Sequence, residues 1–218
     1  MPYQPKPKPV KAVHPRTISG QAQKARTRAA IIRAAIPIFA SHGPDLPVID
    51  DFVKAAGVSR GTFYNYFQTT RDLLEASMAC ISDELIETII PAVADESNPV
   101  IRFSTAARLF YRKARLDPVF RAFLGSVSGV GNLAVQEARA DLEEAIEKGL
   151  VKVRDIELAE AIAFGVMVFA LRTSKAEKGG QERSREVVRA MLNALGVEPD
   201  LIERAMRVPL PPPPQGNV

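Results

Sequence analysis

The segment from Val48 to Phe67, VIDDFVKAAGVSRGTFYNYF, restricts the fold more than any other part of this 218-residue chain. Phe52 and the apolar residues around it recur at the spacing of one helix face. Gly57 follows, and glycine most readily takes the positive φ at which helices end. Ser59 then offers an N-cap for a second helix. A helix, a glycine turn and a second helix form either a helix-turn-helix or an ordinary hairpin of a helical bundle.

The second of these helices, expected over residues 59 to 66, is rich in side chains that form hydrogen bonds. Arg60 is the first candidate for a base or phosphate contact, because a guanidinium pairs in bidentate fashion with guanine O6 and N7. Gly61 lets the backbone approach DNA closely. The remaining candidates on this helix are Thr62, Tyr64, Asn65 and Tyr66.

The residues in and around this segment resemble the tetracycline-repressor (TetR) family of bacterial transcriptional regulators. The resemblance begins with RAAIIRAA at Arg28, includes Phe39 and Gly43, and continues through AAGVSRGTFYNYF to Asp72-Leu-Leu. It covers about 50 residues, a quarter of the chain. The run AAGVS-x-G-T-x-Y-x-Y-F is specific to that family rather than to helix-turn-helix proteins in general.

Two positions depart from the family pattern. The family often has Thr at the start of its second helix, where it caps the helix and touches phosphate, and this chain has Val48. The family commonly has Lys shortly after the recognition helix, and this chain has Thr70 followed by Arg71. With these positions included, the predicted DNA-contacting residues are Val48, Ser59, Arg60, Gly61, Thr62, Tyr64, Asn65, Tyr66, Thr70 and Arg71.

The resemblance implies an all-α protein with an N-terminal three-helix DNA-binding head and a C-terminal helical body for ligand binding and dimerisation. It implies a homodimeric transcriptional regulator, a repressor released from double-stranded operator DNA by a small apolar or aromatic effector. The alternative is a helical protein-interaction module that keeps the head and is not regulated by a small molecule. The expected divisions are a disordered Pro-rich basic arm (1–20), the head (21–70), the body (71–207) and a disordered Pro-rich tail (208–218).

The charge of the chain is unevenly distributed. Residues 1 to 75 contain eleven Lys and Arg against five Asp and Glu, a net charge of +6. Residues 76 to 218 contain eighteen against twenty, a net charge of −2. A basic N-terminal third fits contact with DNA phosphates, although a solvated basic face gives the same count. Lys6, Lys8 and Lys11 either lie along DNA or belong to an idle tail.

Between the arm and the tail the pattern is helical, and no segment has a convincing strand pattern. Pro37 lies inside the first expected helix and predicts a kink there. The helix expected up to Gly149 has a polar face that includes Glu137, Arg139 and Asp141. Outside the helix-turn-helix, the expected helices are Gln21–Ser41, Thr70–Ile90 ended by Pro91, Val100–Leu116, a short one after Asp117-Pro118, Ser126–Gly149, Ile156–Lys175 and Ser184–Leu195.

A small-molecule site inside the helical body follows from the resemblance, and aromatic and apolar side chains suit its walls. The helical spacing of each candidate fits a residue of the hydrophobic core equally well. Arg108 or Arg112 is expected either to meet an acidic group of the effector or to be exposed. The predicted lining residues are Phe103, Phe110, Tyr111, Phe120, Phe123, Phe164, Met167 and Val168.

Between Ala161 and Leu171 every residue is apolar or glycine. A helix that is apolar on all sides must be covered on all sides, by the core of one chain or by a partner subunit. In the resembled family the last two long helices of each subunit form a four-helix dimer interface. The predicted interface residues are Ala161, Gly165, Phe169, Arg172, Val188, Met191, Leu192 and Leu195.

Other chemistry is weakly represented in the sequence. His14 and His42 are the two histidines, and neither has a Ser or Cys in a triad context, so no enzyme is expected. Cys80 is the single cysteine, which excludes an intrachain disulfide and fits a reducing cytoplasm. The glycines from Gly125 to Gly131 have no phosphate-loop lysine, and we expect a helix-helix turn there. We expect no metal, no cofactor, no secretory signal and no membrane span.

Overall fold

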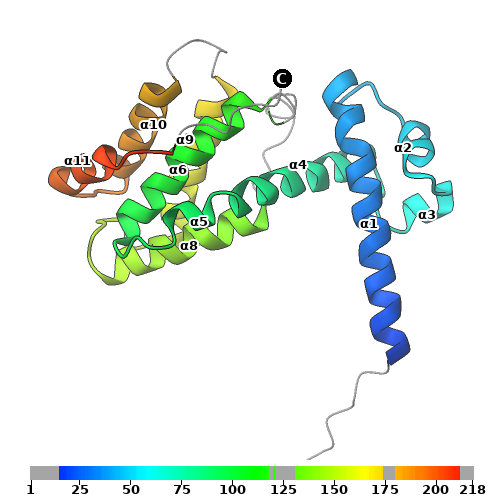
Figure 1. The fold of residues 1–218 in the computed structure, drawn as a ribbon, viewed down its shortest axis with the longest axis horizontal. Coiled ribbons are helices and arrows are strands. Elements are labelled where there is room, and N and C mark those ends of the chain that lie inside the picture. Colours follow the sequence, from blue (N-terminus) through cyan, green and yellow to red (C-terminus); the bar gives the residue numbers. More distant parts are fainter. Residues whose placement is uncertain (1–14, 118–119, 121–130, 174–179, 212–218) are drawn as a thin grey trace, which may run out of the picture.

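The computed structural model describes residues 15–117, 120, 131–173 and 180–211. All regular structure in these ranges is helical, as predicted. Three helices form the head: α1 (Pro15–His42), α2 (Ile49–Ala56) and α3 (Arg60–Tyr64). The long helix α4 (Thr70–Glu87) leads from the head into the body, and the head lies well apart from the remaining helices (Figure 1).

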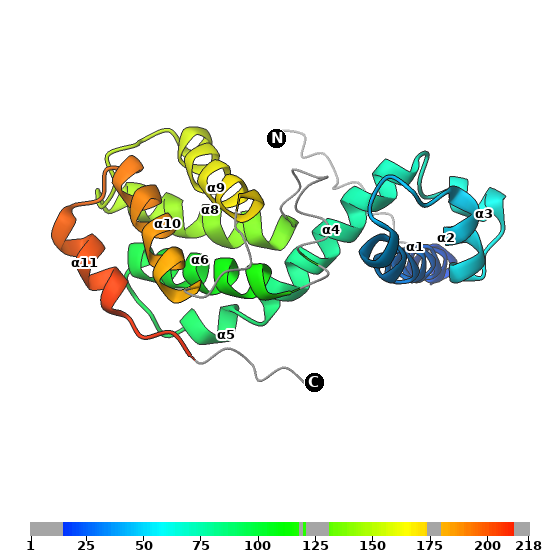
Figure 2. The same ribbon diagram turned by 90° about the horizontal axis from the view of Figure 1, so that it is seen from above.

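The body is built around one central helix, α6 (Pro99–Leu116), which contacts most of the other body helices. Asn98 starts α6 because its side-chain oxygen accepts the backbone N–H groups of Val100 and Ile101. Figure 2 shows α8, α9, α10 and α11 arranged around this helix, with α4 entering from the head. The remaining body helices are α5 (Ile90–Val93), α8 (Asn132–Glu147), α9 (Ile156–Arg172), α10 (Gly180–Ala194) and α11 (Pro199–Arg207).

Aromatic packing holds the head together. Phe39 of α1 and Phe52 of α2 pack with tilted rings whose centroids are 4.8 Å apart, and both are buried. Phe63 of α3 is fully buried and lies 5.9 Å from the ring of Phe67. The first pair holds α2 against α1, and the burial of Phe63 leaves the other side of α3 at the surface.

Several helix boundaries differ from the prediction. Helix α1 begins at Pro15, so part of the expected irregular arm is helical, because proline is tolerated at the first position of a helix. The helix also continues past Pro37 to His42. Pro91 does not end the long helix; α4 ends at Glu87, and Pro91 lies in the first turn of the separate helix α5, where its missing N–H costs nothing.

The C-terminal part of the body contains a helix that was not predicted. Helix α10 ends at Ala194, and Gly196 takes a φ of 75° before α11 begins at Pro199. Helix α9 ends at Arg172 and α8 begins at Asn132, each shorter than expected. Of the short helix predicted after Asp117, the structure describes Phe120, whose N–H donates to Asp117 Oδ1 at 2.9 Å. The predicted turn at 125–130 lies outside the described residues.

Candidate nucleic-acid interface and effector cavity

The turn between α2 and α3 has the geometry that its sequence predicts. Gly57 takes a φ of 64°, and its N–H bonds back to α2. Ser59 Oγ accepts the N–H of Thr62 at 3.0 Å and so caps α3. Val48 has no side-chain acceptor, and Asp51 compensates because its carboxylate accepts the N–H of Val48 at 2.8 Å. The Val48 departure from the family pattern therefore leaves the start of α2 intact.

Arg60 and Asp50 form a two-point ion pair between α3 and α2. Arg60 Nε donates to Asp50 Oδ1 at 2.6 Å, and Nη2 donates to Oδ2. Both side chains are exposed. The hydrogen bond from Arg60 holds the pKa of Asp50 below its ordinary value. Asp50 therefore fixes the direction of the Arg60 guanidinium, whose planar fork of N–H groups lies on the surface of the head. The sequence did not single out Asp50 as a functional residue.

None of the ten predicted DNA-contacting residues is buried. Helix α3 is shorter than expected, and it ends at Tyr64, so Asn65 and Tyr66 lie in the turn after it. Thr70 is the first residue of α4, and Arg71 forms an ion pair with Glu75 at 3.3 Å. The exposed polar surface of the head therefore includes α3 and the start of α4.

A cavity of about 70 Å³ lies in the body between α4, α6, α8, α9 and α10. An apolar cavity of roughly 150 Å³ admits benzene, so a cavity of this volume limits a ligand to a single ring at most. Its lining residues are Ile86, Phe103, Ala106, Ala107, Phe110, Ala134, Glu137, Ala138, Asp141, Ala163, Phe164, Met167 and Met191.

Four of the predicted lining residues are in this wall: Phe103, Phe110, Phe164 and Met167. The other predictions differ. Tyr111 is a fully buried core residue, and Phe120 packs edge-on against Phe110 at 5.6 Å without lining the cavity. Val168 of α9 is also absent from the wall, and Phe123 lies outside the described residues.

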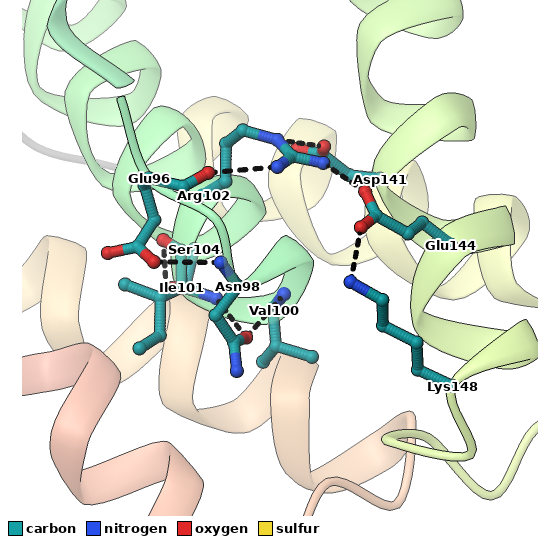
Figure 3. Close-up of polar contacts among 9 residues, drawn as sticks. All are labelled: Glu96, Asn98, Val100, Ile101, Arg102, Ser104, Asp141, Glu144 and Lys148. Carbon is teal, nitrogen blue, oxygen red and sulfur yellow. Dashed lines mark hydrogen bonds and ion pairs between the residues drawn. The ribbon is translucent and has the colours of Figure 1, made fainter. Parts of the chain in front are cut away.

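Asp141 is the functional candidate that sequence reasoning missed. It was expected on the solvated face of its helix, yet it is only 8% exposed and lines the cavity. Arg102 of α6 donates from Nε to Asp141 Oδ1 at 2.6 Å and from Nη2 to Glu144 at 2.5 Å (Figure 3). Burial raises the pKa of Asp141 to about 6, although the Arg102 hydrogen bond acts in the opposite direction.

The two arginines expected to face an acidic effector or solvent are buried elsewhere. Arg108 Nη1 donates to the carbonyl oxygens of Ala205 at 3.1 Å and Val208 at 3.0 Å, and Arg112 donates to Pro211. Neither arginine lines the cavity. Burial lowers the pKa of Arg108 to about 10, with Arg185 and Arg112 adding to the effect. These guanidiniums hold the end of α11 against α6, where helix carbonyls lack partners.

The predicted interface residues divide into two groups. Ala161, Gly165, Phe169 and Arg172 are exposed and share one face of α9, with Phe169 67% exposed. The predicted residues of α10 were assigned to the wrong surface, because they point into the core of the same subunit. These core residues are Val188, Met191, Leu192 and Leu195, and none is more than 1% exposed.

No helix within the described part of the chain is long and apolar enough to cross a membrane. Within the same part, no group of three or more His, Cys, Asp or Glu side chains is arranged to hold a metal ion.

Comparison with protein families gives one match over the head. The model described as bacterial regulatory proteins of the tetR family matches residues 31–77. A curated relative, the uncharacterized HTH-type transcriptional regulator YvdT of Bacillus subtilis (strain 168), is 39% identical over 62 residues. Those residues are 28% of this chain and 29% of YvdT, so the match spans less than a third of the relative.

Solved structures match the fold over most of the chain. RolR in complex with resorcinol has a TM-score of 0.69 at 23% identity and covers 88% of this chain and 98% of its own. FadR of Bacillus subtilis in complex with stearoyl-CoA has a TM-score of 0.56 at 20% identity and covers 75% of this chain and 97% of its own. At these identities the two structures establish similarity of fold alone.

Proposed function

We propose, from the match of residues 31–77 to the tetR family of bacterial regulatory proteins, that this chain is a TetR-type regulator and a homodimeric, sequence-specific DNA-binding repressor. The observation that carries the proposal is the exposed face of α3, where Ser59 caps the helix and Asp50 orients the fork of Arg60. Each subunit sets α3 in the major groove, and the two half-sites lie about one helical turn, ~34 Å, apart or slightly more.

The dimer contact is assigned to the exposed apolar face of α9. Phe169 and Leu158 are 67% and 52% exposed, which is unusual for large apolar side chains of a single helix face. Between them Gly165 faces open space, so a second helix has room to approach its backbone closely. On α10 the four core residues named above are unavailable to a partner. The exposed positions of this helix include Arg183, Arg185, Glu186, Ala190, Asn193 and Ala194.

The effector site is assigned to the cavity of the body. Its volume of about 70 Å³ favours a compact ligand such as resorcinol, with which RolR was solved, over the long acyl chain in the FadR complex. Ile86 of α4 lines the cavity, so the helix that carries the head touches the effector. The effector binds more tightly to the dimer conformation in which the two heads do not match the half-site spacing. Such a ligand lowers operator affinity by the ratio of its affinities for the two conformations.

Titration of the full-length protein with the DNA upstream of its own gene tests the proposal. Binding should be tight for that DNA, weaker for a scrambled duplex of equal length, and should weaken steeply as salt rises, because released counterions drive it. A helical protein-interaction module, the alternative function, shows equal and weak binding to both duplexes. That outcome would overturn the regulator proposal.

A further inference from the structure

The wall of the cavity is apolar except on one side. Phe103 and Phe110 of α6 and Phe164 and Met167 of α9 supply most of its large side chains. Of the described residues that line it, two are charged or polar, Glu137 and Asp141, and both come from α8. Both are hydrogen-bond acceptors when ionised. A ligand in this cavity therefore meets one acidic side and no basic one.

The nearby cation, Arg102, offsets part of this acidity, but it pairs with carboxylates and is not exposed in the cavity wall. Its three guanidinium nitrogens are all engaged: Nε with Asp141, Nη2 with Glu144, and Nη1 with the carbonyl oxygen of Glu96 at 2.9 Å (Figure 3). Arg102 also does not belong to the lining. Its guanidinium is committed to these three acceptors, and none of its remaining N–H groups belongs to the cavity wall.

Among the described residues, the carboxylate of Asp141 is engaged at one of its two oxygens. Arg102 occupies Oδ1, whereas no donor among the described residues bonds to Oδ2. The residue is more than nine-tenths buried, so water reaches it poorly. Asp141 lines the cavity, so a donor on a ligand would meet this carboxylate and form a charge-assisted hydrogen bond with it. Glu137 is exposed and lies at the rim, where solvent satisfies it.

We infer that the cavity selects a single-ring apolar ligand that donates a hydrogen bond to Asp141, through a hydroxyl or a protonated amine, and that it rejects carboxylates. The inference rests on the proposed function, since it names the chemical class of the effector. Replacing the donor by a carboxylate would set two anions against each other in an apolar cavity.

Calorimetric titration of the full-length protein with four probes of similar size tests the inference. Toluene measures the apolar contribution, phenol adds a neutral donor, benzylamine adds a cationic donor, and benzoate adds an anion. Phenol or benzylamine should bind at least roughly tenfold more tightly than toluene, since a hydrogen bond to a buried charge is strong. Benzoate should not bind. The stronger of phenol and benzylamine identifies the hydroxyl or the amine as the natural donor.

Two substitutions separate ligand recognition from the ion-pair network. Asp141→Asn keeps the size of the side chain and should bring the phenol affinity down to that of toluene. Glu144→Gln is the matched control, because Glu144 also binds Arg102 from α8 but does not line the cavity, and it should keep the wild-type preference. Circular dichroism checks that both variants fold. If Asp141→Asn does not fold, the titration of the wild-type protein with the four probes still tests the inference.

Benzoate binding as tight as phenol binding, or phenol binding no better than toluene, overturns the inference. Operator affinity measured without any probe keeps this failure distinct from a failure of the proposed function. Donor selectivity without DNA binding would contradict the regulator proposal alone. DNA binding together with a preference for benzoate would contradict the ligand class alone.

Discussion

Asp50 of α2 holds the guanidinium of Arg60 of α3 by both of its carboxylate oxygens, across the turn of the helix-turn-helix. The turn itself is fixed by Gly57 and by the Ser59 cap, so the two helices present the pair in a defined direction. A fork that is held in place loses less freedom when it meets the edge of a guanine.

Arg60→Ala should weaken binding to the operator by roughly 5- to 150-fold if the fork reads a guanine. Arg60→Lys is the matched control, because it keeps the charge and loses the fork. The lysine variant should retain affinity for non-specific DNA and lose most of the discrimination. Fluorescence anisotropy at one fixed salt concentration measures both. Unchanged operator affinity in the alanine variant would remove Arg60 from the contacts.

Asp50→Asn should lower the ratio of specific to non-specific affinity. The neutral side chain holds the Arg60 fork less firmly, which weakens base reading, while loss of a negative charge from the head favours contact with any phosphate backbone. Competition between operator and scrambled duplexes measures the ratio. A higher ratio in the variant would mean that Asp50 restrains Arg60 from DNA instead of positioning it.

Phe169→Glu should give folded monomers that bind operator poorly. The side chain is 67% exposed, so the charge is tolerated in the subunit but opposes burial against a partner. Val188→Glu is the contrasting variant, because Val188 is fully buried and the charge should unfold the subunit. Sedimentation gives the mass, and circular dichroism gives the helix content. A Phe169→Glu variant that stays dimeric would place the contact elsewhere.

Phenol affinity should depend on the ionisation of Asp141. Burial raises its pKa to about 6; Arg102 of α6 opposes this effect, and the charges of Glu137 and Glu144 of α8 add to it. The ionised form accepts the hydrogen bond, so the affinity is present above this pKa and is lost as the pH falls through it. The dissociation constant for phenol should therefore rise as the pH is lowered from about 7 to about 5, and that for toluene should not. A pH-independent phenol affinity would contradict Asp141 as the acceptor.

The head was predictable because its signals act over single helical turns. Gly57 ends one helix and Ser59 caps the next, and each does so through its own backbone or side chain. Arg60 was found for the same reason, since it lies at the start of a capped helix. Its partner Asp50 is ten residues away, and helical spacing within either helix does not indicate that pair.

The body was less predictable because long-range packing decides it. Phe110 and Tyr111 are neighbours with the same apolar character, yet one lines the cavity and the other is core. Asp141 belongs to a strongly charged helix, which suggests exposure. Its carboxylate is buried in a pair with Arg102, which lies 39 residues earlier in the chain. Helix α11 is held by carbonyl bonds to Arg108, about a hundred residues before it. Periodicity in one segment contains none of this information.

The continuity of α4 sets the scale of motion at the DNA. The helix is fixed to the head at one end, where Thr69 and Asp72 cap it reciprocally, and it reaches the cavity at Ile86 near the other end. At ~1.5 Å per residue, the distance from Thr70 to Ile86 along the axis is about 24 Å. A tilt of about 5° over that length moves the head by about 2 Å. In a symmetric dimer the two displacements change the distance between the recognition helices by about 4 Å. The helices then no longer match half-sites that lie ~34 Å apart.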